Sequence, residues 1–265
     1  MSDEATVPGV DASVPSVARV YDFLLGGKDN FASDRTMAKK LMEVSPEIRD
    51  TALMNREFGK RVTECVAAEG IGQYVDMGSG IPTTPPSIHD TARAEVPGAR
   101  VVYVDNDSVV AAHSRALRTT APGLGTIEAD VRHPDRVFTD PELTGNIDLT
   151  RPVAVLFISV LQTVREHDDV LAIVRDVRGR MAVGSYLAIS HVWDGSTPEA
   201  IANIHRSSND TGYPPVAIRS TEQVAEYFDG FEILTPGLVD IRDWRPDGEP
   251  PDVTIRLVGG VGRKL

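Results

Sequence analysis

The sequence predicts an α/β protein with a mostly parallel β-sheet, and three observations support this class. From about residue 72 onward, short strand-like runs alternate with longer runs of helical periodicity, as in chains that build doubly wound sheets. The run from Val153 to Leu161 is almost entirely apolar, which is typical of a strand covered on both faces. With 265 residues, the chain is long enough for one large domain or two small ones, and no internal repeat divides it.

Residues 1–14 are rich in Pro, Gly, Asp and Ser, and we expect them to form a flexible tail. Residues 15–265 are expected to form a single domain, with a helical segment over 15–70 and an α/β core over 71–265. Capping residues, an early proline and terminal glycines mark the helices of the first part. These helices are expected over 16–27, 33–42 and 45–70.

In the core, strands and helices follow one another until the last two strands, which are expected to pair antiparallel across a turn-rich segment. Strands are expected over 73–77, 100–105, 125–130, 153–160, 185–192, 231–241 and 252–262. Helices are expected over 85–96, 108–120, 166–181, 197–208 and 220–230. No element is expected in the polar stretch 131–152.

Composition and charge limit the partners that we expect. Hydrophobic residues make up 41% of the chain and charged residues 25%, as in ordinary soluble globular proteins. The net charge of −12 repels nucleic acid and anionic membrane surfaces, so we expect neither as a partner. The acidic N-terminus lacks a signal pattern and no apolar run could cross a bilayer, so a cytoplasmic protein is expected. The sequence does not indicate an oligomeric state.

No metal site is predicted. Cys65 is the only cysteine, which excludes a disulfide within one chain and a cysteine-based zinc site. The six histidines show no metal-ligand spacing such as H-E-x-x-H.

Polar residues stand at the carboxyl ends of the first five expected strands, and in parallel sheets ligands bind at this edge. Taken singly, a glycine after a strand or an acid at its end more often serves a turn or a helix cap. Here three successive strands end in an aspartate, at Asp76, Asp105 and Asp130. This combination favours a ligand site.

The first of these strand ends does not suit a phosphate. A dinucleotide site requires a third glycine where Thr83 stands. An uncompensated carboxylate at Asp76, close to a pyrophosphate, is unfavourable by roughly a few kcal/mol. The P-loop pattern is also missing, and so is a Tyr-x-x-x-Lys pair at the fourth strand end, so a nicotinamide-dependent oxidoreductase is the weaker alternative.

S-adenosylmethionine (SAM) suits the same residues better, because it has no phosphate and carries an ammonium group, a sulfonium, a ribose diol and an adenine. We expect Gly78 and Gly80 to let the backbone approach the ligand. Asp76 is expected near the ammonium group. Asp105 is expected to accept hydrogen bonds from both ribose hydroxyls.

The following strand ends complete the expected SAM site. Asp130 is expected to accept the adenine amino group, with the Val131 N–H on a ring nitrogen, and Ser159 to face the methyl-donor pocket. The cofactor-binding residues expected in the core are Asp76, Gly78, Ser79, Gly80, Thr83, Asp105, Asn106, Asp130, Val131 and Ser159.

Four stretches of the chain are those of one known family: ARVYDFLLGGKDNFASDR (18–35), VDMGSGIPT (75–83), VVYVDND (101–107) and GVGRK (260–264). From about Ser16 onward the chain resembles the S-adenosyl methyltransferase family that was once listed as a domain of unknown function. The resemblance implies the Rossmann-like class I methyltransferase fold, with a seven-stranded, mostly parallel sheet in the order 3-2-1-4-5-7-6, strand 7 antiparallel, and helices on both faces. It also implies SAM as the cofactor, but it supplies no substrate.

Two positions depart from the family pattern. Gln162 follows the fourth strand where the family commonly has a histidine, so the base or ligand contact of such a histidine is missing here. Ile81 replaces the usual leucine, which is a mild change.

The stretch from Gly26 to Arg35 is dense in polar residues. It could be a surface connector between two helices. Because the resemblance is most specific here, we favour a lid across the cofactor. In that arrangement Tyr21, Asn30 and Arg35 reach the methionine end of SAM, and Arg35 pairs with its carboxylate.

Methyl transfer from a sulfonium mainly requires that the nucleophile, the methyl carbon and the sulfur be held in line in a water-poor pocket. A general base is needed only if the acceptor must lose a proton. His191, at the fifth strand end, is the candidate base, although a histidine that is simply hydrogen-bonded at a strand end is equally compatible with the sequence.

The predicted function is therefore a SAM-dependent methyltransferase that acts on a small-molecule acceptor. The alternative is a non-catalytic SAM-binding sensor or interaction protein on the same fold. It predicts cofactor binding without turnover and no acceptor-sized cavity.

Overall fold

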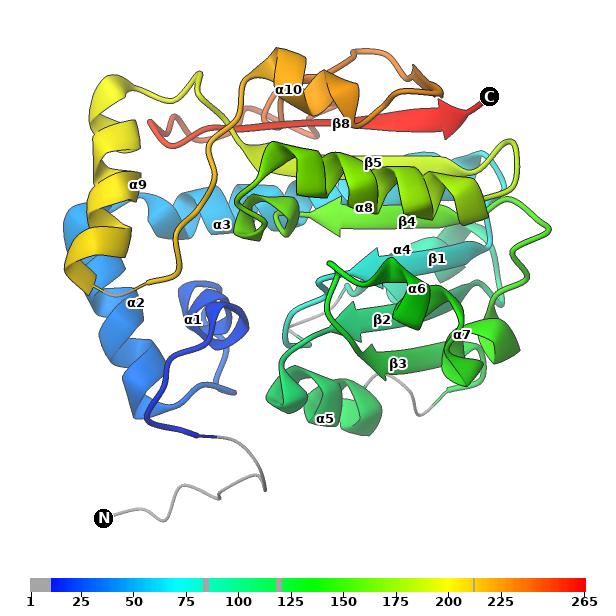
Figure 1. Ribbon diagram of the computed structural model, residues 1–265, viewed down its shortest axis with the longest axis horizontal. Coiled ribbons are helices and arrows are strands. Elements are labelled where there is room, and N and C mark those ends of the chain that lie inside the picture. The colour runs from blue at the N-terminus through cyan, green and yellow to red at the C-terminus, as the bar shows by residue number, and fades with distance from the viewer. Residues whose placement is uncertain (1–10, 83–85, 118–120, 212) are drawn as a thin grey trace.

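The computed structural model describes residues 11–82, 86–117, 121–211 and 213–265, and in it a central β-sheet is covered by helices on both faces (Figure 1). The strands are β1 (Gln73–Met77), β2 (Arg100–Asp105), β3 (Leu124–Glu128), β4 (Ala154–Ile158), β5 (Tyr186–Val192), β6 (Phe231–Ile233), β7 (Val239–Asp240) and β8 (Leu257–Lys264). The helices are α1 (Val17–Leu24), α2 (Ala32–Val44), α3 (Ile48–Ala68), α4 (Ile88–Glu95), α5 (Ser108–Leu117), α6 (Pro134–Phe138), α7 (Pro141–Asn146), the 3₁₀ turn η1 (Leu161–Thr163), α8 (His167–Arg180), α9 (Pro198–Thr211) and α10 (Thr221–Glu226).

The sheet has the order β3-β2-β1-β4-β5-β8-β6, and β7 pairs with β8 off this path. The predicted order is confirmed, with β8 as the antiparallel strand. The strand expected over 231–241 is divided into β6 and β7, so the sheet has eight strands. Pro236 between them has no N–H for a ladder hydrogen bond, and Gly237 turns the chain with a φ of 105°.

Side chains alternate between the two faces of the sheet, as the period of a β-strand requires. On β1, Val75 and Met77 pack into one core, and Tyr74 packs into the other. The first core lies under α6, α7, α8 and α10, and the second under α3 and α4. Both cores are continuous along the sheet, so the carboxyl ends of the strands are held at a fixed edge.

Some predicted elements differ from the structure. The polar stretch 131–152 contains the short helices α6 and α7, and in each a proline at the first turn starts the helix. Residues 11–14 form a hydrogen-bonded turn rather than a loose tail, since the Val14 N–H donates to the carbonyl of Asp11 and Ser33 Oγ donates to Ala12. Residues 1–10 of the expected tail lie outside the described residues.

The N-terminal helices form a third, smaller core. Val20 and Leu24 of α1 pack against Met37 and Leu41 of α2, with Tyr213 at its border. Figure 1 shows α1 beyond the carboxyl ends of the parallel strands, which point toward it.

Arg19 joins this N-terminal unit to the sheet. Its Nε donates to Asp34 of α2 at 2.9 Å, and its Nη1 donates to Asp107, which follows β2, at 3.1 Å. Ser16 donates a further hydrogen bond to Asp107. Arg19 and Asp34 are almost completely buried, so each charge depends on the other for compensation.

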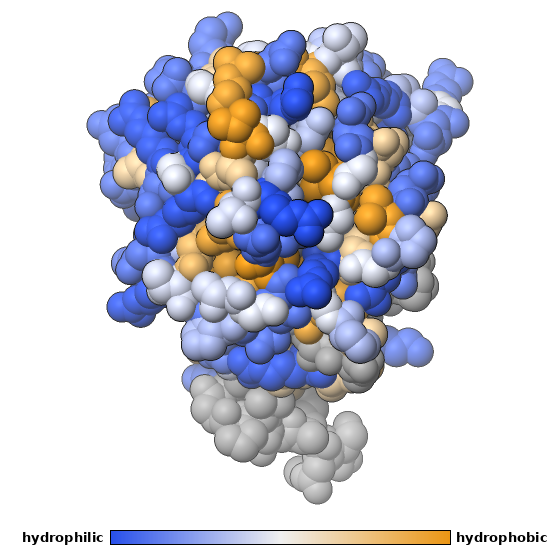
Figure 2. Space-filling view, turned by 90° about the vertical axis from the view of Figure 1, so that its right-hand side faces the viewer, coloured by the Kyte–Doolittle hydropathy of each residue, from blue (hydrophilic) through white to orange (hydrophobic). Residues whose placement is uncertain are grey.

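The opposite end of the sheet faces the viewer in Figure 2, where hydrophilic residues surround several small, separate apolar patches. Among the described residues, no helix is long and apolar enough to cross a membrane.

Replacing Arg19 by Gln is expected to lower the free energy of unfolding by about 3–5 kcal/mol, because two carboxylates lose their buried cation. Urea-induced unfolding of the wild type and the variant measures this difference. The exposed Arg49→Gln is the control, for which a change within about 0.5 kcal/mol is expected. Equal effects of the two substitutions would show that Arg19 does not anchor the N-terminal unit.

Candidate functional site

A cavity of about 940 Å³ lies at the carboxyl ends of β1 to β4 and extends to α1 and α3. This volume is at the upper end of the roughly 300–1,000 Å³ that is typical of small-molecule sites. Most of the residues predicted to bind a cofactor line it. They are Tyr21, Asp76, Gly78, Ser79, Gly80, Asp105, Asn106, Asp130, Val131 and Ser159. Thr83 lies outside the described residues.

The two glycines of the turn after β1 have different surroundings. Gly78 has a φ of 82°, and a Cβ there would lie 2.5 Å from Cγ2 of Val160, in the turn after β4. Gly78 therefore permits close packing between two strand ends. Gly80 has a φ of 61°, but a Cβ there would meet no atom of the described residues within 4 Å. The space beside Gly80 is open to the cavity, where a ligand could approach the backbone.

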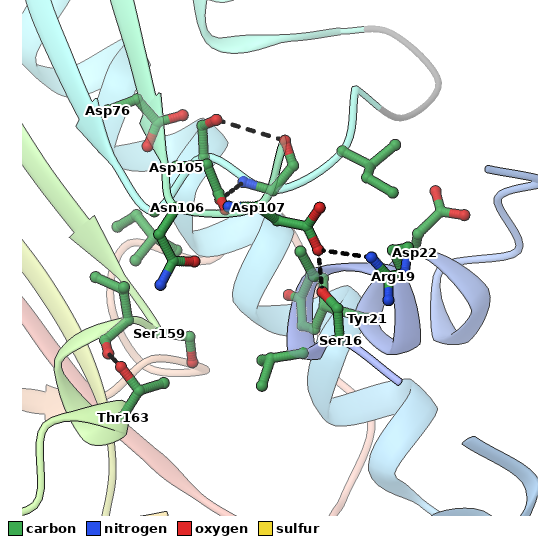
Figure 3. A pocket seen from close by; sticks show the side chains of 18 of the residues that line it. Ser16, Arg19, Tyr21, Asp22, Asp76, Asp105, Asn106, Asp107, Ser159 and Thr163 are labelled. Atoms are coloured by element: carbon green, nitrogen blue, oxygen red, sulfur yellow. Dashed lines mark hydrogen bonds and ion pairs between the residues drawn. The ribbon is translucent and has the colours of Figure 1, made fainter. Parts of the chain in front are cut away.

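Asp105 holds this turn from the neighbouring strand. Its Oδ2 accepts from the Gly80 N–H at 2.9 Å, and its Oδ1 accepts from the Asp107 N–H at 3.0 Å. Asp76 is 7% exposed and stands on the adjacent strand (Figure 3). The two strand ends thus bring two mostly buried carboxylates to one wall.

The end of β3 is arranged differently from the expectation. Asp130 accepts from Nε of Arg132 at 3.0 Å, and this hydrogen bond lowers the pKa of Asp130. The carboxylate that was expected to accept an adenine amino group therefore already has a cationic partner. Asn106 is exposed at the cavity wall, and its amide is accessible to a ligand.

At the end of β4, Ser159 has a left-handed backbone with a φ of 58°, which is uncommon for a residue with a side chain. Its Oγ accepts from Nε2 of Gln162 at 2.9 Å. Gln162, which replaces the histidine common in the family, thus positions Ser159 from behind the cavity wall. Strained residues of this kind cluster at functional sites.

A buried hydrogen-bond chain connects the cavity to β5. Tyr21 donates its hydroxyl proton to the Ala52 carbonyl at 2.9 Å and accepts from Nδ2 of Asn55 at 3.2 Å. Oδ1 of Asn55 accepts from Oγ of Ser190 at 2.6 Å. Asn55 was missed from the sequence, although its position on the inward face of α3, between Ala52 and Phe58, marks it as a buried polar residue.

The structure does not bring Asn30 and Arg35 to the cavity. Nδ2 of Asn30 donates to Asp22 at 2.8 Å, and Nη1 of Arg35 donates to the Asn30 carbonyl at 2.6 Å. The Asp29 N–H also donates to Asp22, and a Cβ on Gly27 would lie 1.9 Å from its Oδ1. The polar turn after α1 therefore wraps around Asp22, which lines the cavity itself.

His191 also differs from the expectation. Its side chain is fully buried and does not line the cavity. Nε2 lies 2.7 Å from Nη1 of Arg219, and Nδ1 lies 2.8 Å from the Val192 carbonyl. Because Arg219 can only donate, Nε2 accepts and Nδ1 carries the proton. Burial lowers the pKa of His191 to about 4. Both ring nitrogens are occupied, so this histidine is placed as a structural residue and not as a base.

No group of three or more metal-binding side chains that could hold an ion occurs among the described residues.

Comparisons with known proteins agree with this architecture. A family model described as S-adenosyl methyltransferase matches residues 3–265. A crystallised DUF574 family protein from Streptomyces avermitilis MA-4680 is 34% identical, with a TM-score of 0.90 over 96% of this chain and 99% of its own. A methyltransferase candidate from Thermobifida fusca YX is 36% identical, with a TM-score of 0.89 over 97% of both chains. No curated protein matches.

The burial of His191 predicts a pH dependence of stability. The folded protein keeps the imidazole neutral down to about pH 4, whereas the unfolded chain binds a proton near its ordinary pKa of 6.5. Between these values the unfolded state binds more protons. The contribution of the neutral His191 to the free energy of unfolding is therefore complete above pH 6.5. As the pH falls from 6.5 to 4, the free energy of unfolding decreases by about 3 kcal/mol.

Urea-induced unfolding at several pH values between about 4 and 7.5 measures this loss. The His191→Gln variant is expected to lose about 3 kcal/mol less than the wild type over this range. The exposed His205→Gln is the control and should follow the wild type. The same pH dependence in the wild type and in His191→Gln would contradict a buried, neutral His191.

Proposed function

We propose that this chain, which belongs to the S-adenosyl methyltransferase family and is a SAM-dependent methyltransferase, binds SAM in the cavity at the ends of β1 to β4. We propose further that it methylates a small molecule there. The observation that carries the proposal is the pair of mostly buried carboxylates, Asp76 and Asp105, that line the cavity beside the glycine turn of β1.

The residues of the cavity fit SAM. Asp105 lies at the cavity wall beside Gly80, and a carboxylate there suits the two hydroxyls of a ribose diol. Asp76 suits the ammonium group, because a carboxylate that is 7% exposed gains from a cation. The open space at Gly80 allows close approach to the backbone. Asn106, Asp130 and Val131 are proposed to surround the adenine, with Asp130 shared between the ligand and Arg132.

When bound, SAM supplies an electrophilic methyl group on a sulfonium. The chain contributes position and the exclusion of water, which are the main requirements of such a displacement. α1 covers the strand ends, and Ser159 and Tyr21 border the same space. The proton of Tyr21 is committed to the Ala52 carbonyl, so its oxygen can only accept a hydrogen bond from a ligand.

The charge of the cavity bears on the acceptor. Seven acidic residues and four basic residues line its described part. Such a lining disfavours polyanions, in agreement with the net charge of −12. We therefore propose an uncharged or cationic small molecule, and not nucleic acid, as the methyl acceptor. No histidine lines the described part of the cavity, which favours an acceptor whose nucleophile needs no imidazole base.

The non-catalytic alternative predicted no room beside the cofactor. The volume of about 940 Å³, at the upper end of the range of small-molecule sites, does not support that prediction. A cytoplasmic location remains a prediction from composition.

The Asp105→Asn variant tests the cofactor site. Because two charge-assisted hydrogen bonds are weakened, the affinity for S-adenosylhomocysteine should fall by about 100-fold. Isothermal titration calorimetry measures the affinity, and the exposed Asp135→Asn serves as the control. Binding of NADH with no binding of S-adenosylhomocysteine to the wild type would overturn the proposal.

A further inference from the structure

We propose that Arg56 of α3 is the residue that binds the carboxylate of the methionine end of SAM and so sets the specificity of the site for the complete cofactor. The inference rests on the proposed function, because it assumes that SAM occupies this cavity. It assigns to Arg56 the contact that the sequence pattern assigned to Arg35, whose guanidinium is hydrogen-bonded to the Asn30 carbonyl outside the cavity lining.

The cations of the cavity wall differ in their partners. Arg19 is bound to Asp34 and Asp107, and Arg132 is bound to Asp130. Lys60 lies 3.4 Å from Glu64. Within the described parts of the chain, Arg56 has no hydrogen-bonded or ion-paired partner, although it is half-buried and lines the cavity. A half-buried guanidinium without an ion pair is stabilised more by an anionic ligand than a cation that is already paired.

The neighbours of Arg56 on α3 place it near the carboxyl ends of β4 and β5. Asn55 bonds to Tyr21 and Ser190, and a Cβ on Gly59 would lie 3.7 Å from Ile158 at the end of β4. α3 also packs against α4, the helix that follows the glycine turn of β1. Residues 55–59 of α3 therefore lie at the ends of β4 and β5, in the lining of the cavity.

The electrostatics of Tyr21 agree with this placement. Burial raises the pKa of Tyr21, and the hydrogen bond from Asn55 and the positive charge of Arg56 oppose that rise. The guanidinium thus acts on a hydroxyl that lies at the cavity wall, next to the chain of Tyr21, Asn55 and Ser190.

The chemistry of the ligand requires both charges. The methionine end of SAM is a zwitterion, and Asp76 offers a partner only for its ammonium group. The carboxylate would be repelled by a wall with more acids than bases unless one cation faces it. A guanidinium can bind a carboxylate through two parallel hydrogen bonds, which a lysine cannot do.

Calorimetric titration of the whole chain with two probes tests the inference. One probe is S-adenosylhomocysteine, and the other is its decarboxylated analogue, 5′-(3-aminopropylthio)adenosine. Replacing Arg56 by Gln should weaken the first probe by about 10–100-fold and leave the second within about twofold. Arg49→Gln, an exposed arginine on the same helix outside the cavity lining, should affect neither probe. Arg56→Lys should give an intermediate affinity for the first probe only.

Each result decides one point. If Arg56→Gln binds S-adenosylhomocysteine as well as the wild type does, the inference is wrong and the proposed function stands. If the two probes are weakened equally, Arg56 supports the fold and does not read the carboxylate. If the wild type binds neither probe, the proposed function fails and the inference fails with it.

Discussion

The buried guanidinium of Arg19 is the interaction on which the cavity depends. It connects Asp34 of the N-terminal helices with Asp107 at the edge of the sheet. Without this bridge, Asp34 and Asp107 would face each other without the buried cation that they share. The bridge keeps α1 over the strand ends, and with it Tyr21 and Asp22, which line the cavity from above. The edge of the sheet thereby becomes the wall of a cavity, in which electrostatic interactions are stronger than in bulk water.

Below this bridge, the strand ends are fastened to one another before any ligand binds. Asp105 accepts from the amide of Gly80, and Gly78 admits Val160 from the turn after β4. Because the donors and acceptors are held by neighbouring strands, little reorganisation is required when a ligand arrives.

The ionic arrangement also explains the choice of ligand. Two carboxylates on adjacent strands oppose a phosphate but suit an ammonium group and a diol. Arg19, Lys60 and Arg132 of the cavity wall are each ion-paired with an acidic residue of the chain. Among the described residues of the wall, Arg56 is the cation without such a partner. A zwitterionic ligand such as SAM meets both signs of charge.

Site residues could be predicted from the sequence where a pattern repeats from strand to strand. They could not be predicted where the role of a residue depends on one contact with a residue distant in the sequence. Asp76, Asp105 and Ser159 could be predicted together because parallel topology brings successive strand ends to one edge. The helix α6 could not be predicted, because five residues are too few to show a helical period.

The role of His191 depends on Arg219, which is 28 positions away in the sequence. The guanidinium of Arg219 donates to Nε2 of His191, so this nitrogen has no lone pair left to take a proton from a substrate. The polar turn from Gly26 to Arg35 was conspicuous in the sequence, but its partner, Asp22, was not. The polar residues of such a motif can therefore be required by the fold, because they surround one buried carboxylate, even where their side chains do not reach a ligand.

The central claim is that the cavity between α1 and the ends of β1 to β4 is the cofactor site. A crystal structure of the chain with S-adenosylhomocysteine tests it most directly. The account predicts that the ligand lies in this cavity, with its ribose hydroxyls on the carboxylate of Asp105. A ligand bound anywhere else on the molecule, or a ribose turned away from Asp105, would contradict it.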